Sequence, residues 1–321
     1  MKKNFLFLII LLIVSFVMTA CSNEKEQSQK ENDKLSIYTT VFPLQYFTER
    51  IGGKHVNVNT IYPPGADEHT FEPSQKDMIK LADSDLFFYI GLGLEGFVEK
   101  AKTSLKNENV LLIPVAEDLN LESAEEHEHE EEGHEDEGHE DEEHEHGDFN
   151  PHVWLDPIYS KEMASVNKDS LVEKMTDNKH GFVQNYQELA DELDQLNVEF
   201  EDTIKNAKHK DILVTHAAFS YWEHRYGLKE ISISGLSTTN EPSQRELEDI
   251  ISLADELGLH YILFEQNVQS KLAEIVQEEI GAKALPVHNL GILTKENIEE
   301  NETYFSLMKQ NLKSLKTALN D

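Results

Sequence analysis

Histidines are the residues whose number and spacing in this 321-residue chain most clearly suggest chemistry. Six of them lie in residues 125–148, where the remaining residues are 15 carboxylates and three glycines. A stretch this charged has nothing to bury, and imidazoles among carboxylates can bind borderline-soft cations. We therefore expect a solvated auxiliary metal loop rather than a plain acidic spacer. Its candidate ligands are His127, His129, His134, His139, His144 and His146.

Three other histidines, His69, His152 and His216, are distant in sequence but share a local setting. Each stands at the end of a predicted strand, in a predicted loop or just before a predicted helix. In an open α/β sheet, ligands bind beyond the carboxyl ends of the strands. Two of them would come from the first half of the chain and one from the second, and neutral imidazoles suit zinc, copper or nickel, whereas a hard ion such as manganese prefers oxygen ligands.

The elements that would position these histidines follow from hydrophobic patterning. Short β-branched or aromatic segments alternate with helical patterns, which predicts an α/β fold with parallel sheets in two lobes, one for each half of the chain. The predicted strands are residues 35–42, 56–63, 86–91 and 110–115 in the first half, and 212–217, 230–235, 261–267 and 283–287 in the second.

An internal repeat supports two equivalent halves. The sequence "EPSQ" occurs at residues 72–75 and again at 241–244, each time before a helical pattern and then a strand. Ser74 and Ser243 are suited to cap these helices. The shared order of cap, helix and strand indicates that the two lobes have the same local architecture.

A long amphipathic pattern lies between the halves. Apolar residues recur at spacings of three and four over residues 180–210 without a proline, which predicts one helix of about 45 Å. The apolar positions do not hold a heptad register for long, so a dimerising coiled coil fits less well. We expect a single stiff helix that braces two lobes of a monomer.

The first residues resemble an export signal. Two lysines precede an apolar run, and small residues lead to Cys21, the only cysteine. We expect an extracytoplasmic protein that is anchored to the cell membrane by lipid on Cys21. The expected organisation is signal peptide 1–20, lipidated tether 21–34, N-terminal lobe 35–177 with a disordered loop 123–148, linker helix 178–208 and C-terminal lobe 209–321.

The charge balance narrows the range of partners. The chain has 28 basic and 62 acidic residues, for a formal net charge of −34. Binding to nucleic acid or to anionic lipid headgroups relies on basic residues, so neither is an expected partner of the folded part. Cations are the expected ligands.

Three segments, "GADEHTFEPSQKD", "NPHVWLDP" and "THAAFSYWEHRYGL", resemble the signature segments of ABC-transporter substrate-binding proteins that capture zinc or manganese. The resemblance covers residues 35–319, and the insert rich in histidine and acid is similar to that of the zinc-specific members. It implies two (β/α) lobes joined by a rigid helix, one metal ion in the cleft, and delivery to a membrane permease with its ATPase subunit.

The resemblance also implies a ligand set. Its metal ligands fall on His69, His152 and His216, and because manganese-binding relatives have a glutamate at the third position, His216 favours zinc. The fourth ligand is open among Glu68, His288 and water.

The expected function is therefore high-affinity zinc uptake, in which Zn²⁺ is captured and released without catalysis. An exported zinc-dependent hydrolase is the alternative, with Glu68 as general base, since three histidines and an open position also make a catalytic site. No HExxH motif supports it. A surface adhesin that binds zinc incidentally is a third possibility.

Overall fold

The computed structural model describes residues 34–121, 149–237, 239–266 and 270–321. The expected signal peptide, Cys21 and all six histidines of the acidic loop lie outside the described residues. None of the helices within the described ranges has the length and apolar content that a membrane-spanning helix needs.

The N-terminal lobe is built on a parallel sheet with the strand order β2-β1-β3-β4. Strand β3 is buried at all four positions, as expected for a parallel strand covered on both faces. The strands are β1 (Leu35–Thr39), β2 (Val56–Thr60), β3 (Leu86–Tyr89) and β4 (Leu111–Pro114). The helices are α3 (Phe42–Gly52), α4 (Gln75–Ala82), α5 (Val98–Leu105) and α6 (Pro157–Lys174).

The C-terminal lobe repeats this plan with the strand order β6-β5-β7-β8, again all parallel. Its strands are β5 (Asp211–His216), β6 (Lys229–Ser234), β7 (Tyr261–Glu265) and β8 (Lys283–Val287). Its helices are α8 (Ser220–Tyr226), α9 (Gln244–Glu256), α10 (Lys271–Ile280), α11 (Lys295–Glu299) and α12 (Tyr304–Ala318). The prediction of two parallel α/β lobes is confirmed.

Helix caps explain where the repeated helices begin. The Ser74 hydroxyl accepts a hydrogen bond from the backbone N–H of Asp77, and the Asp77 carboxylate accepts one from the backbone N–H of Ser74. Ser243 and Glu246 form the same capping box at the start of α9. Each box satisfies two backbone donors that a helix start leaves unpaired, so the "EPSQ" repeat does encode matching helix starts.

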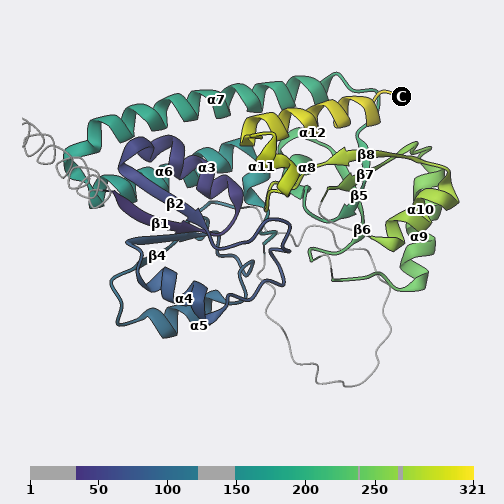
Figure 1. The fold of residues 1–321 in the computed structure, drawn as a ribbon. Coiled ribbons are helices and arrows are strands. Elements are labelled where there is room, and N and C mark those ends of the chain that lie inside the picture. The colour runs from purple at the N-terminus through teal and green to yellow at the C-terminus, as the bar shows by residue number, and fades with distance from the viewer. Residues whose placement is uncertain (1–33, 122–148, 238, 267–269) are drawn as a thin grey trace, which may run out of the picture.

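Helix α7 (Lys179–Lys205) runs along both lobes (Figure 1). Its 27 residues span about 40 Å at 1.5 Å per residue, slightly less than the sequence pattern suggested, because the helix ends at Lys205. It contacts α3 and α6 of the N-terminal lobe and α8 and α12 of the C-terminal lobe. The side chains that it buries are Phe182, Leu189, Ala190, Leu193, Leu196, Phe200 and Ile204.

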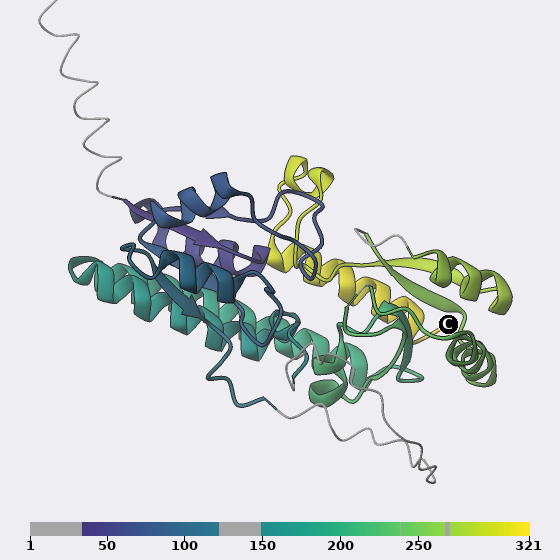
Figure 2. The same ribbon diagram turned by 90° about the horizontal axis from the view of Figure 1, so that it is seen from below.

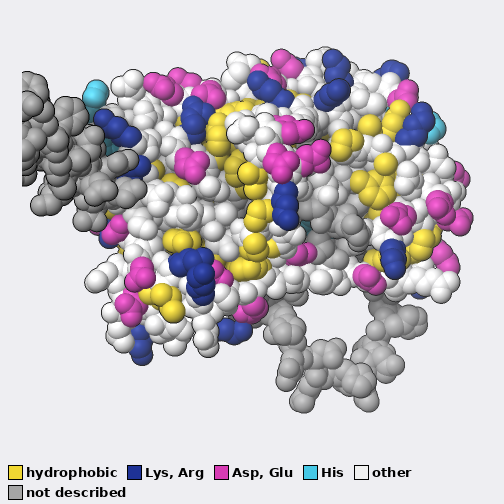
Figure 3. Space-filling view, viewed as in Figure 1, with side chains coloured by type: hydrophobic (Ala, Val, Ile, Leu, Met, Phe, Trp, Pro, Cys, Tyr) yellow, Lys and Arg dark blue, Asp and Glu magenta, His cyan; other side chains and the backbone are white. Residues whose placement is uncertain are grey.

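The lobes also meet through the segment that follows β8. Two backbone hydrogen bonds cross the seam, from Phe42 N to Gly291 O at 2.9 Å and from Gly65 N to Leu293 O at 3.2 Å. The view from below shows α12 lying beside the C-terminal part of α7 (Figure 2). Apolar side chains form a band along the seam on the face drawn in Figure 3. One apolar core extends through both lobes, so wide separation of the lobes would expose it to water.

The stabilising role of α7 can be tested with one core substitution. Leu193→Ala should lower the free energy of unfolding by about 2–5 kcal/mol, because Leu193 is fully buried and the change leaves a cavity. Urea unfolding measures the effect. Val198→Ala on the same helix, where the valine is 47% exposed, is the control and should change stability by no more than about 0.5 kcal/mol. Equal losses in both variants would contradict this account of α7.

Candidate metal centre

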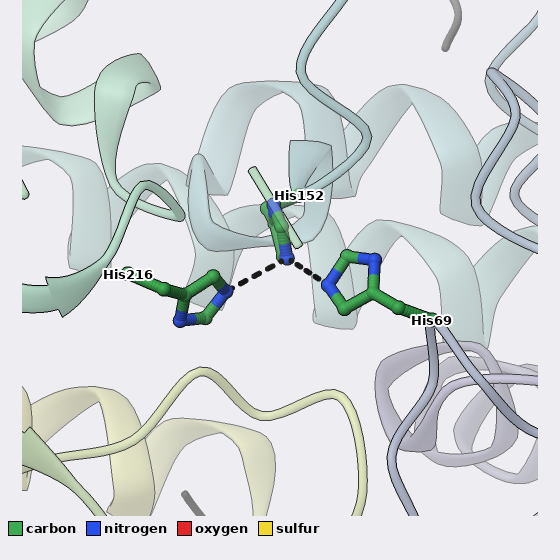
Figure 4. Close-up of side chains that lie close together, drawn as sticks. All are labelled: His69, His152 and His216. Atoms are coloured by element: carbon green, nitrogen blue, oxygen red, sulfur yellow. Dashed lines mark hydrogen bonds between the residues drawn. The ribbon is translucent and has the colours of Figure 1, made fainter. Parts of the chain in front are cut away.

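The structure brings His69, His152 and His216 together at the seam between the lobes. His69 lies in the loop between β2 and α4, His152 lies just before the short 3-10 helix η3 (Val153–Leu155), and His216 is the last residue of β5. One ring nitrogen from each lies within 4.8 Å of the other two. Figure 4 shows the three rings turned toward a common point, with His152 in the middle.

Two of the three separations between these nitrogens match those of ligands to a single ion. His152 Nε2 lies 3.2 Å from His69 Nε2 and 3.3 Å from His216 Nε2. Two nitrogens, each ~2.0–2.1 Å from a tetrahedral zinc ion, lie about 3.3 Å apart. His152 and His216 are fully buried, whereas His69 is partly exposed, so the site opens to solvent on the side of His69.

Asn150 fixes the proton on the ring of His152. The Asn150 amide nitrogen donates to Ala217 O at 3.0 Å and to Ser220 Oγ at 2.8 Å. The Asn150 oxygen must therefore be the atom that faces His152 Nδ1 at 2.7 Å, and it accepts the Nδ1 proton. The lone pair of His152 is left on Nε2, and the same amide ties the His152 loop to the segment after His216. Burial, followed by the charges of His216 and His69, holds the pKa of His152 well below its usual range.

Glu265, at the end of β7, fixes the proton on Nδ1 of His216. The His216 Nδ1–H donates to Glu265 Oε1, which also accepts from Thr215 Oγ1 at 2.6 Å. A carboxylate oxygen only accepts here, so in the neutral ring, the form that binds a metal ion, the lone pair of His216 is on Nε2. Burial lowers the pKa of His216, but the charge and hydrogen bond of Glu265 outweigh it and raise the pKa to about 8.

Glu68 is buried near the three rings but is not a member of their cluster. Its Oε1 accepts a hydrogen bond from Asn289 Nδ2 at 2.9 Å, so the carboxylate is turned toward the C-terminal lobe. Burial raises the pKa of Glu68 to about 7, although the charge of His216 opposes this shift. The structure therefore places this candidate fourth ligand against an amide instead of against the imidazoles.

His288, the other candidate fourth ligand, is held apart from the cluster by its own hydrogen bonds. Its Nδ1 accepts from Leu290 N at 3.1 Å, and its Nε2 lies 3.0 Å from Asn297 Oδ1. Both ring nitrogens are used in shaping the turn that follows β8, so neither has a lone pair free for a metal ion.

Sequence reasoning missed Asn150, Glu265 and Asn289. Asn150 sits two residues before His152, a spacing suited to a local side-chain hydrogen bond. The position of Glu265 at the carboxyl end of a strand was a usable signal, but its contact with His216 depends on β7 lying beside β5. That neighbour relation is not visible in the sequence.

Comparisons with known proteins agree with this architecture. The family model for the periplasmic component A of zinc-uptake complexes matches residues 37–318. The zinc-binding lipoprotein AdcA of Streptococcus pneumoniae is 34% identical over 98% of this chain and 61% of its own length. The chain thus spans about three fifths of that relative. The high-affinity zinc uptake system protein ZnuA of Bacillus subtilis is 33% identical over 99% of both chains.

A solved structure extends the likeness to three dimensions. The Zn(II)-bound ZnuA-like domain of Streptococcus pneumoniae AdcA superposes with a TM-score of 0.73 at 31% identity, covering 90% of this chain and 100% of that domain. Two parallel-sheet lobes with a long helix are common to these neighbours and to this chain. The chain belongs to the family of the periplasmic component A of zinc-uptake complexes.

Proposed function

We propose that this protein captures Zn²⁺ outside the cytoplasmic membrane and delivers it to an ABC permease with its ATPase. The observation that carries the proposal is the convergence of three imidazole nitrogens from both lobes, which lie within 4.8 Å of one another, with His152 Nε2 at ligand spacing from the other two. Zinc relatives in the same family support it. His69, His152 and His216 are the proposed ligands, and zinc is the cargo rather than a resident cofactor.

The donor set favours zinc over manganese. The cluster offers three imidazole nitrogens and no carboxylate among the described residues, and manganese prefers oxygen donors. Two of the rings have their Nε2 lone pairs directed by Asn150 and Glu265. Preset rings lose less conformational freedom on binding, which favours tight capture.

Binding and release, without catalysis, complete the proposal. Family membership indicates a transport binding protein. In the hydrolase alternative Glu68 would be the general base, but its carboxylate is hydrogen-bonded to Asn289 and its loop has no metalloprotease motif. The shared core and α7 favour small loop movements over a wide hinge during release.

The remaining parts of the proposal concern segments outside the described residues. Lipid on Cys21 would hold the monomeric receptor at the membrane, with residues 21–34 as a tether. The six histidines of residues 125–148 would collect zinc in weak, exchangeable sites close to His152 in sequence. Support for both rests on the sequence patterns and, for the anchor, on the lipoprotein relative.

Competitive metal titration of the mature domain tests the ligand assignment. His216→Ala should weaken zinc binding by more than about 100-fold, because loss of an outer-shell partner alone costs 10–100-fold. His260→Ala, an exposed histidine of the same lobe, should bind as the parent does. Preferred binding of manganese by the parent, or tight zinc binding by His216→Ala, would overturn the proposal. Normal growth of a strain that lacks this protein under zinc limitation would favour the third possibility, a surface adhesin that binds zinc incidentally.

A second prediction concerns the proton on His216. Glu265→Gln should bring the pKa of His216 down from about 8 to below its ordinary value, because burial remains while the carboxylate charge is lost. NMR titration of the imidazole resonances in metal-free protein measures this shift. Glu95→Gln is the control and should leave the pKa of His216 unchanged. Glu95 is also a buried carboxylate, but its hydrogen bonds go to Thr40, Ile90 and Gly91. A pKa that stays near 8 in Glu265→Gln would contradict the assigned contact.

Deletion of residues 125–148 tests the division between tight and weak sites. One high-affinity zinc site should persist and the weak sites should disappear, because the six loop histidines are removed while His69, His152 and His216 are kept. Isothermal titration with zinc gives the stoichiometry. Loss of the tight site on deletion would show that the loop supplies essential ligands.

A further inference from the structure

We propose that Asn289 positions the loops of His69 and His152, and that Glu68 serves as its partner across the seam and not as a zinc ligand. This inference rests on the proposed function, since its consequence is the time for which the ion is retained. Asn289 lies in the turn after β8, far in sequence from both histidines.

Every polar group of the Asn289 side chain, together with its carbonyl, is engaged. Its Nδ2 donates to Glu68 Oε1 at 2.9 Å, and Glu68 immediately precedes His69. Its backbone oxygen accepts from Trp154 Nε1 at 2.5 Å, two residues beyond His152. Its Oδ1 accepts from Gly291 N at 3.0 Å, which fixes the amide orientation. One residue of the C-terminal lobe thus restrains two ligand loops of the N-terminal lobe.

Burial makes these bonds consequential. Glu68 is 4% exposed, Asn289 is 1% exposed and Trp154 is fully buried. Water cannot readily replace a lost partner there, and an unpaired buried polar group costs more than its hydrogen bond contributes. The Glu68–Asn289 pair is therefore a firm attachment of the His69 loop to the other lobe.

Gly291 shows that the seam is shaped around the Glu68 carboxylate. A Cβ at this position would lie 2.5 Å from Glu68 Oε1 and 2.8 Å from its Cδ. Gly291 also accepts the hydrogen bond from Phe42 N that crosses the seam. The absent side chain leaves the space that the carboxylate occupies beside Asn289.

The restraint matters most for His69. His69 is the only one of the three histidines that is not fully buried, so its loop is where an ion can leave with least disruption. Attachment of Glu68 to Asn289 opposes that movement. Loss of the attachment should speed release of zinc without removing any of the three nitrogen donors.

Reversing the hydrogen bond provides a sharp test. In Asn289→Asp two carboxylates face each other, and zinc release to a chelator should quicken by about tenfold or more, in line with the 10–100-fold effect of outer-shell partners. Adding Glu68→Gln to Asn289→Asp restores a bond of opposite direction, from the introduced amide to the introduced carboxylate. Release from this double variant should return to within about threefold of the parent.

Glu68→Gln alone distinguishes an attachment from a ligand. The substituted amide still presents an oxygen to Asn289 Nδ2, so zinc release and the cobalt(II) absorption spectrum should stay close to those of the parent. If zinc release from Glu68→Gln is about ten-fold faster or more, and release from the double variant is not slowed again, then Glu68 coordinates the ion. That result would overturn the inference. Unchanged release from Asn289→Asp would overturn it as well.

Control measurements separate this inference from folding and from the proposed function. Asn297→Asp alters a buried asparagine of the same segment that contacts His288 and Thr294, and it should release zinc at the parental rate. An equal acceleration in Asn297→Asp would assign the effect to general destabilisation and overturn the inference. Failure of the parent itself to bind zinc would instead overturn the proposed function.

Discussion

The structure depends on one constraint: three imidazole lone pairs from distant parts of the chain must point at the same place. A histidine ring can meet this demand only if the proton on its other nitrogen is held elsewhere. Asn150 and Glu265 hold that proton for His152 and His216. The architecture around the site consists of two equivalent sheets whose carboxyl ends approach each other. It places Asn150 and Glu265 beside His152 and His216.

Much of the fold could be predicted because local rules decide it. The strands follow from short β-branched and aromatic runs, and the starts of α4 and α9 follow from Ser74 and Ser243. The apolar period of three and four predicted α7, with only its last turn misplaced. Each of these features depends on residues within one or two turns of each other.

The environment of the site could not be predicted to the same depth, because it depends on neighbours in space. Glu265 reaches His216 only because β7 pairs with β5. Glu68 was a candidate ligand from its place beside His69, and nothing in the sequence indicated that its carboxylate would accept a hydrogen bond from Asn289 in the other lobe. His288 likewise has both nitrogens engaged within its own turn. Side-chain orientation in a buried site is set by such competition for partners.

The two acidic groups buried beside the imidazoles have an electrostatic consequence. Glu68 and Glu265 together can supply two negative charges in a region from which water is largely excluded. Neutral imidazoles cannot balance the charge of a divalent cation, whereas two carboxylates can, so the loaded cleft approaches electroneutrality. When the cleft is empty, protons are the available counter-charges, and arrival of the metal ion should expel them. Cation charge, as well as donor preference, is thereby a property to which the interior of this protein is matched.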